Sequence, residues 1–194
     1  MDQKDEDLIT EFQQGNLAAF DALFGRYKKQ IFNFSLRLLN NRADAEDATS
    51  EVFMKLFEKK NYYQPTNAKF STWLFTIAYN VCISKIRSRK STASLWFRRN
   101  NDTEETPLDI PDQTPSTPEK LMTLENILMI QRAIDKLPEK QKEALILREY
   151  NQFSYQEIAQ IMTCSIDQVK ILIFRAREFL RDNTPHLKAE GQNG

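Results

Sequence analysis

Two helix-start signals lie eleven residues apart within "SYQEIAQIMTCSIDQVKILIFRAR", residues 154–177. Ser154 with Glu157, and Ser165 with Gln168, each match the capping box that opens a helix. Two helices this short must meet at a corner, which is the pattern of a helix-turn-helix. The second helix of that motif enters the major groove and brings its N-terminal residues close to base edges. The chemistry predicted here is therefore the reading of duplex DNA.

Small, apolar and basic residues support this interpretation. Ala159 falls where two crossing helices need a small side chain, and Arg175 and Arg177 supply cations for the phosphate backbone. An ordinary helical hairpin is the alternative, because short patterns of this kind also occur in proteins that bind no DNA. The shared core of the two helices is predicted to consist of Ile158, Met162, Val169 and Ile173.

Two apolar residues of the second helix point away from that core. At about 100° per residue, Ile171 and Phe174 lie outside the buried stripe of the helix. The exposed face is therefore partly apolar, and it suits either thymine methyl groups or a partner protein. The sequence leaves these two readings open. The buried stripe is predicted to run through Val169, Ile173, Ala176 and Leu180.

A second candidate site lies in the loop "EKKNYYQPTNAKF", which is too polar and too broken by Pro65 to be helical. It presents Tyr62, Tyr63 and Phe70 beside lysines. Extruding a base from a duplex costs a few kcal/mol, which aromatic and amide groups offset by stacking and hydrogen bonding. This loop is a candidate wall for such a pocket. For the nearby Trp73, plain core packing is favoured over direct base contact.

Helices must position both sites, because apolar residues recur at helical spacing through most of the chain. Before the loop, one stripe runs from Phe20 to Leu39 and a second from Val52 to Phe57. A third begins after Ser71, the expected N-cap, and continues to Ile86. Further helices are expected from Glu119 to about Leu137 and from Pro138 through Arg148.

Charge is segregated although the formal net charge is zero. Residues 85–99 carry Lys and Arg without an acid, and residues 100–119 carry Asp and Glu without a base. The acidic block also holds four prolines and few large apolar residues, which predicts a flexible linker between two domains. A solvated surface or a plain spacer is the alternative for both blocks.

Composition, 41% hydrophobic and 28% charged, excludes disordered and fibrous classes. No apolar run approaches the roughly 20 residues that span a bilayer, and the acidic start lacks the order of a signal peptide, so a cytoplasmic protein without membrane insertion is expected. Cys82 and Cys164 are predicted to be buried free thiols. A single histidine, His186, leaves no zinc ligand cluster and no evident general base, and no metal and no cofactor are expected.

Four motifs, in order, resemble an extracytoplasmic-function (ECF) sigma factor of the bacterial sigma-70 family. They are "NNRADAEDATSEVFMKLF", "FSTWLFTIAYNVCISKIRSRK", "LPEKQKEALILREYNQFSYQEIAQIMTCSIDQVK" and "FRAR". The resemblance implies a promoter-specificity subunit that binds RNA polymerase core at the beta-prime clamp and beta flap, recognises promoter DNA and assists its opening. An anti-sigma factor is a further expected partner. The resemblance also implies that the chain has no catalytic residues of its own and is not an enzyme.

The implied fold is all-α, with two small helical domains joined by a flexible acidic linker. Residues 1–92 correspond to sigma region 2, which binds core and reads and melts the minus-ten element. Residues 93–120 correspond to the linker, 121–185 to the region 4 helix-turn-helix that reads the minus-thirty-five element, and 186–194 to a disordered tail. In the family the linker passes toward the RNA path, so an acidic segment there suits either a role at that path or a plain spacer.

The resemblance assigns roles by position in the first domain. The clamp-binding helix matches Asp44 to Phe57, with Ser50 where the family more often has Gln. Asn80 is the implied base reader. The implied core-binding residues are Asp47, Ser50, Glu51, Phe53 and Leu56. The implied minus-ten residues are Tyr62, Tyr63, Phe70, Trp73, Tyr79, Asn80, Lys85, Arg87 and Arg89.

In the second domain the chain departs from the family pattern. Ile171 and Leu172 stand where a small polar residue and Arg are common, and Thr163 replaces the usual corner Gly. A stand-alone helix-turn-helix regulator and a helical adaptor without nucleic acid are the competing functions, and neither would require the clamp-like helix or the aromatic loop. The implied minus-thirty-five residues are Ser165, Asp167, Gln168, Lys170, Ile171, Phe174, Arg175 and Arg177.

Overall fold

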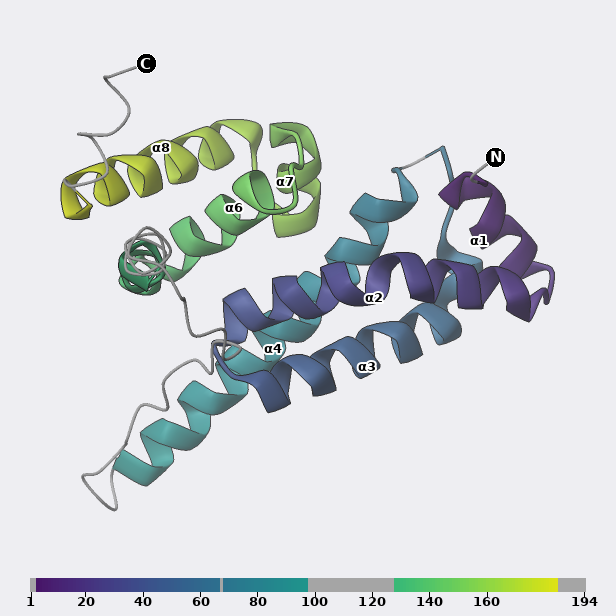
Figure 1. Cartoon of the computed structure of the whole chain (residues 1–194), viewed down its shortest axis with the longest axis horizontal. Coiled ribbons are helices and arrows are strands. Elements are labelled where there is room, and N and C mark those ends of the chain that lie inside the picture. The colour runs from purple at the N-terminus through teal and green to yellow at the C-terminus, as the bar shows by residue number, and fades with distance from the viewer. Residues whose placement is uncertain (1–2, 67, 98–127, 185–194) are drawn as a thin grey trace, which may run out of the picture. The chain divides into compact units, whose positions relative to one another are not determined.

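The computed structural model describes residues 3–66, 68–97 and 128–184, and these form two separate helical units (Figure 1). Unit 1 contains four α-helices and one short 3-10 turn, and unit 2 contains the helical residues 128–135 and three further helices. No strand occurs among the described residues. The elements of unit 1 are α1 (Asp5–Gln13), α2 (Leu17–Leu39), α3 (Arg42–Lys59), η1 (Lys60–Tyr62) and α4 (Phe70–Phe97). Those of unit 2 are α6 (Glu139–Glu149), α7 (Tyr155–Met162) and α8 (Ile166–Asn183).

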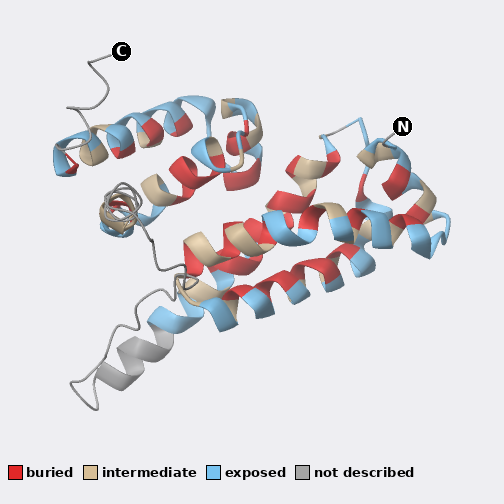
Figure 2. Ribbon diagram, in the orientation of Figure 1, coloured by how far each residue is buried: buried red, intermediate tan, exposed pale blue. Residues whose placement is uncertain are grey.

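The core of unit 1 lies between α2, α3 and α4 (Figure 2). The predicted stripes form these helices, because Ile31, Leu56 and Leu74 are fully buried. Asn16 caps α2 through the N–H of Ala18, and Asn41 caps α3 through the N–H of Asp44. Side-chain caps of this kind satisfy backbone donors that a helix start leaves open.

Helix α1 was not anticipated from the sequence, and it ties down the start of α4. The carboxylate of Glu6 accepts a hydrogen bond from the backbone N–H of Phe70 at 3.2 Å. The expected N-cap at Ser71 is therefore wrong: α4 begins at Phe70, and the N–H of Phe70 is bonded from α1. Asp5 on α1 also accepts from Arg26 and from the Tyr27 hydroxyl, and burial together with this bond raises the pKa of Tyr27.

In unit 2 both predicted capping boxes are present. Ser154 and Glu157 bond reciprocally at the start of α7, and Ser165 and Gln168 do so at the start of α8. Between them Thr163 adopts φ 52°, the left-handed conformation that glycine adopts with least strain. A β-branched residue therefore forms the corner at which the resemblance implies Gly.

The predicted shared core of unit 2 is confirmed. Ile158, Val169 and Ile173 are fully buried, and Met162 and Ala159 are nearly so. Ile134, Leu137, Leu145 and Ala176 form a further buried cluster in unit 2. The helix expected from Pro138 is α6, which begins at Glu139.

Several expectations fall partly or wholly outside the described residues. Helix α4 continues to Phe97, so residues 93–97, placed at the start of the linker from the sequence, are helical. The rest of the linker, the beginning of the second domain before residue 128, His186 and the 186–194 tail lie outside the described ranges. Within the described ranges, none of the helices is both long and apolar enough to cross a membrane.

Candidate functional site

One exposed polar row runs along α3. Asp47 and Ser50 are exposed, and Glu51 is half-buried. Glu51 pairs with Lys55 at 3.3 Å and lies 4.0 Å from the Lys85 ammonium of α4. The Ser50 hydroxyl donates to the Glu46 carbonyl at 3.1 Å, so the side chain lies along its own helix. The structure thus brings together three of the five core-binding candidates on one accessible helix face.

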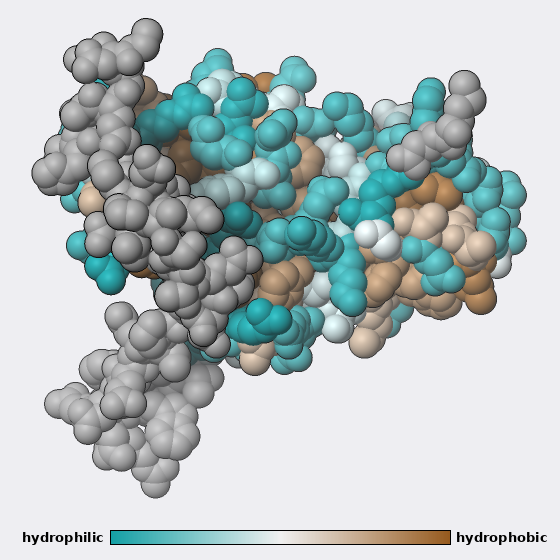
Figure 3. Space-filling view, viewed as in Figure 1, coloured by the Kyte–Doolittle hydropathy of each residue, from teal (hydrophilic) through white to brown (hydrophobic). Residues whose placement is uncertain are grey.

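The other two candidates, Phe53 and Leu56, are corrected by the structure. They are 4% and 0% exposed, because they point into the packing between α3 and its neighbours. Met54, which the sequence did not single out, and Phe57, which it placed in the apolar stripe, are exposed instead, at 61% and 48%. In Figure 3 an apolar area lies over the beginning of α2 and the end of α3. Helical spacing alone could not separate Phe57 from the buried stripe that it extends.

The aromatic loop is also divided between surface and core. Tyr62 is 80% exposed, whereas Tyr63 and Phe70 are buried. The Tyr63 ring packs against Phe70 and Trp73, and its hydroxyl donates to the Ala68 carbonyl at 3.0 Å. Burial raises the pKa of Tyr63 to about 12. Tyr63 and Phe70 therefore pack beneath the loop as part of the core. Of the three aromatic residues, Tyr62 alone presents its ring to solvent.

An aromatic residue, an amide and a cation share one side of α4. Trp73, Asn80 and Arg87 are spaced seven residues apart, which places them within about 40° of one another around the helix axis. Trp73 is half-buried, whereas Asn80 and Arg87 are exposed. This combination offers stacking, edge hydrogen bonds and a phosphate contact, as a single strand requires. We call these three residues the α4 stripe.

Three further minus-ten candidates lie away from that stripe. Tyr79 is buried at 5% exposure, so it packs in the core. Lys85 lies about 140° around the axis from Asn80 and faces Glu51 of α3. Arg89 pairs with Asp44 and donates to the Leu39 carbonyl at 3.0 Å, so it anchors α4 to the ends of α2 and α3. Burial thus withdraws Tyr79 from direct strand contact, whereas the strand-contact roles of Lys85 and Arg89 stay predictions.

The outward residues of α8 lie where the sequence predicted. All eight minus-thirty-five candidates are exposed, including Ile171 at 50% and Phe174 at 61%. The Ser165 and Gln168 side chains, however, are occupied by the capping box. Lys170 bonds Asp167 at 3.0 Å on the solvent side of the helix.

Arg177 has a structural partner that the sequence did not reveal. Its Nε and Nη2 donate to Glu149 Oε1 at 3.1 and 2.6 Å, which joins α8 to the end of α6. This hydrogen bond raises the pKa of Arg177. The pair lies beside a cavity of about 360 Å³ that is also lined by Ile134, Tyr150 and Leu180. A separation of 28 residues between the partners gives no local sequence signal.

The cysteines are free thiols in different surroundings. Cys82 is buried within unit 1 and Cys164 is half-buried at the corner before α8, so the expectation of two buried thiols is wrong for Cys164. Burial raises the pKa of Cys82 to about 11. No group of His, Cys, Asp and Glu in the described ranges is arranged to hold a metal ion.

Two family models match the chain, one in each unit. The sigma-70 region 2 model matches residues 23–92, and the sigma-70 region 4 model matches residues 127–180. The chain is 30% identical over 177 residues to the RNA polymerase sigma-H factor of Pseudomonas aeruginosa, covering 91% of each chain. It is 32% identical over 174 residues to the ECF RNA polymerase sigma factor SigW of Bacillus subtilis, covering 89% of this chain and 92% of the relative.

Solved structures show the same fold. The sigma factor RpoE of Bartonella quintana, in complex with the anti-sigma factor NepR, is 25% identical with a TM-score of 0.68. The match covers 84% of this chain and 95% of that one. CnrH, in complex with the cytosolic domain of CnrY, is 19% identical with a TM-score of 0.64, over 92% of this chain and 95% of that one.

Proposed function

The chain belongs to the extracytoplasmic-function branch of the sigma-70 family, and from that premise we propose how its two units divide the work at a promoter. It is a sigma factor, which directs RNA polymerase to promoters for transcription initiation, and it is not an enzyme. Unit 1 binds polymerase core and reads the minus-ten element, and unit 2 reads the minus-thirty-five element. The observation that best supports this division is that the sigma-70 region 2 model and the sigma-70 region 4 model match different units of the chain.

The α4 stripe receives the opened strand in this proposal. A base leaving the duplex stacks against an aromatic ring and bonds the Asn80 amide, while Arg87 holds the backbone. Tyr62 supplies a second ring, which is 80% exposed, beside the half-buried ring of Trp73. Stacking contributes about 1 to 3 kcal/mol per base, which is comparable to the few kcal/mol that extrusion costs. Two rings and one amide are therefore enough to favour the open strand.

The accessible row on α3 meets the polymerase clamp. Asp47 and Ser50 are exposed along one face, and Met54 continues that face with an apolar side chain. A polar row that ends in an apolar side chain has the composition of a protein contact. Unit 2 meets the beta flap while α8 lies in the major groove. Such a protein works in the cytoplasm, where the polymerase and promoter are.

An anti-sigma factor is proposed as the regulator of the chain. The support comes from the Bartonella quintana relative, whose structure was solved with the anti-sigma factor NepR. The proposed partners are thus polymerase core, promoter DNA and an anti-sigma protein.

Site-specific crosslinking in the holoenzyme tests the division between the units. A photo-crosslinking amino acid at Ser84, which is exposed on α4, is expected to label promoter DNA near the minus-ten element. The same group at Asp167, which is exposed on α8, is expected to label the minus-thirty-five element. Labelling of one common region from both positions, or labelling that core polymerase does not influence, would contradict the proposal.

A further inference from the structure

We infer that Ile171 and Phe174 form an apolar ridge on α8 that selects thymine through its C5-methyl group in the duplex that unit 2 reads. The inference rests on the proposed function, because it names the base chemistry that this unit recognises. Ile171 is 50% exposed and Phe174 61% exposed. Two neighbouring large apolar side chains at that exposure mark a contact surface.

The ridge lies at the centre of the exposed face of α8. Ile171 and Phe174 are about 60° apart around the helix axis and about 4.5 Å apart along it. That rise is close to one base-pair step of about 3.4 Å, so the two side chains can meet neighbouring base pairs. The buried side of the helix, marked by Val169 and Ala176, lies on the opposite face. The ridge therefore faces directly away from the core of unit 2.

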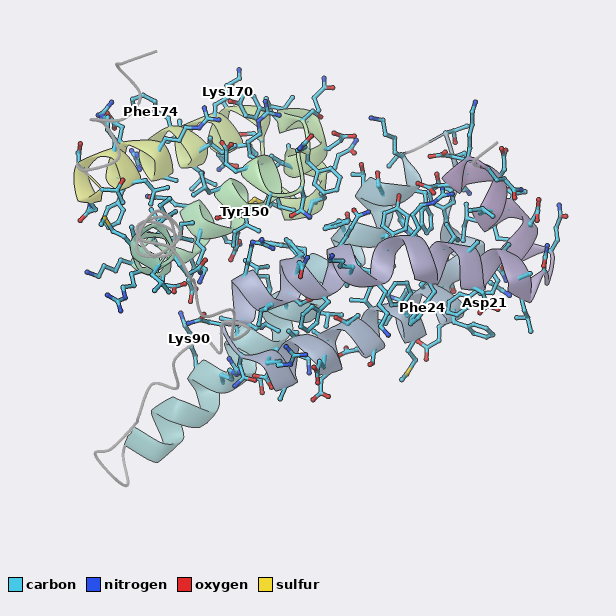
Figure 4. The ribbon with its side chains drawn as sticks, in the orientation of Figure 1. Asp21, Phe24, Lys90, Tyr150, Lys170 and Phe174 are labelled. Atoms are coloured by element: carbon cyan, nitrogen blue, oxygen red, sulfur yellow. The ribbon has the colours of Figure 1, made fainter. Side chains whose placement is uncertain are left out.

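Cations border the ridge on both sides. Lys170 lies about 40° beyond Phe174, and Arg175 lies about 40° beyond Ile171, on opposite edges of the face. Figure 4 shows Lys170 and Phe174 on the side of α8 that is turned away from α6. An apolar ridge between two cations is complementary to a groove whose floor carries methyl groups and whose walls carry phosphates. This arrangement favours duplex DNA over a protein as the occupant.

Two acids lie in line with the ridge along α8, Asp167 one turn before Ile171 and Glu178 one turn after Phe174. Asp167 accepts from Lys170 at 3.0 Å, and Glu178 accepts from Arg181 at 3.4 Å. Each acid thus has a cation beside it on the same helix, which offsets its repulsion of phosphate. Glu178 lies one turn beyond Phe174, nearer the C-terminal end of α8.

The chemistry of base edges identifies thymine as the target. Isoleucine and phenylalanine side chains donate and accept no hydrogen bonds, so they cannot read ring nitrogens or carbonyl oxygens. In the major groove, thymine alone among the four bases presents a methyl group. Removing one buried methyl-sized group is expected to lower affinity about threefold to fivefold.

Replacing thymine with uracil tests this directly, because uracil lacks the methyl and keeps every hydrogen-bonding group. The holoenzyme is first used to select binding sites from a promoter library with a randomised minus-thirty-five region. We expect thymine at one or two neighbouring positions, and uracil there is expected to weaken binding about threefold to fivefold for each methyl removed. In Ile171→Ser and Phe174→Ser holoenzymes this penalty is expected to disappear.

Ile166→Ser is the matched control, since Ile166 is also a partly exposed isoleucine of α8 but lies about 140° around the axis from Ile171. It is expected to keep the uracil penalty. Selected sites that bind equally well with uracil would overturn the inference while leaving the proposed function standing. Loss of core binding in the ridge variants with the uracil penalty intact would assign the ridge to a protein and also overturn it. A holoenzyme that selects no minus-thirty-five sequence overturns both.

Discussion

Arg177 of α8 and Glu149 of α6 are joined by two hydrogen bonds, at 3.1 and 2.6 Å, to a single carboxylate oxygen. The sequence placed Arg177 among the cations for the phosphate backbone, together with Arg175. The bonds between Arg177 and Glu149 instead hold α8 in its orientation relative to α6 and the rest of unit 2. Both side chains are about half exposed, so the pair contributes orientation more than stability.

Salt dependence distinguishes a positioning cation from a phosphate contact. Binding of the full chain to minus-thirty-five duplex alone is expected to be weak and to fall steeply with salt. Lys170→Ala is expected to lower the slope of log affinity against log salt by about one. Arg177→Ala is expected to leave the slope unchanged and to lower the free energy of unfolding by about 0.2 to 1 kcal/mol. Titrations at four salt concentrations measure both slopes, and equal losses of slope would contradict the assignment of Arg177.

Thr163 supplies a prediction about stability. It adopts φ 52°, which costs a residue with a Cβ atom about 1 to 2 kcal/mol. Thr163→Gly is expected to raise the free energy of unfolding by about 0.5 to 1 kcal/mol, after the greater flexibility of glycine in the unfolded chain is subtracted. Thr163→Ala is the control, because alanine keeps the Cβ and the strain. Urea unfolding that shows no difference between the two variants would refute this explanation.

Asn80→Ala tests the α4 stripe. Asn80 is exposed, so its loss is expected to leave the melting temperature and core binding intact. A lost base contact is worth about 1 to 3 kcal/mol, so transcription from duplex promoters is expected to fall about tenfold or more, with relaxed preference at one minus-ten position. A pre-melted template is expected to restore part of the activity. A lower melting temperature with unchanged base preference would instead give Asn80 a purely structural role.

The thiol of Cys82 predicts a pH dependence. Burial raises its pKa to about 11 from an ordinary value of 9.0. The folded state therefore holds this proton more tightly than the unfolded state does, and the associated stability is present below pH 9 and is lost as the pH rises toward 11. Chemical unfolding at several pH values is expected to show a smaller decline in Cys82→Ala than in the parent chain. A decline of the same size in both proteins would exclude Cys82 as its source.

The helices and the helix-turn-helix core were predictable because they rest on local signals. Capping boxes and 3.6-residue spacing act within a few residues of one another, and the boxes at Ser154 and Ser165 formed as expected. The outward direction of Ile171 and Phe174 followed from the same periodicity.

What could not be predicted depends on contacts between distant residues. The cap that Glu6 gives to α4 spans 64 residues, and the anchor between Arg89 and Asp44 joins two helices. Side-chain type alone also could not show which tyrosine of the loop is exposed. Tyr62 and Tyr63 are adjacent in the sequence, and only Tyr63 is buried, because its ring packs against Phe70.

Mapping of transcript 5′ ends tests the central claim most directly. Purified polymerase core transcribes a promoter library with and without the chain, and the start sites are compared. We expect new starts that require the chain and that share two upstream elements, one near minus ten and one near minus thirty-five. Identical start sites with and without the chain, or new starts that share no upstream element, would contradict the account.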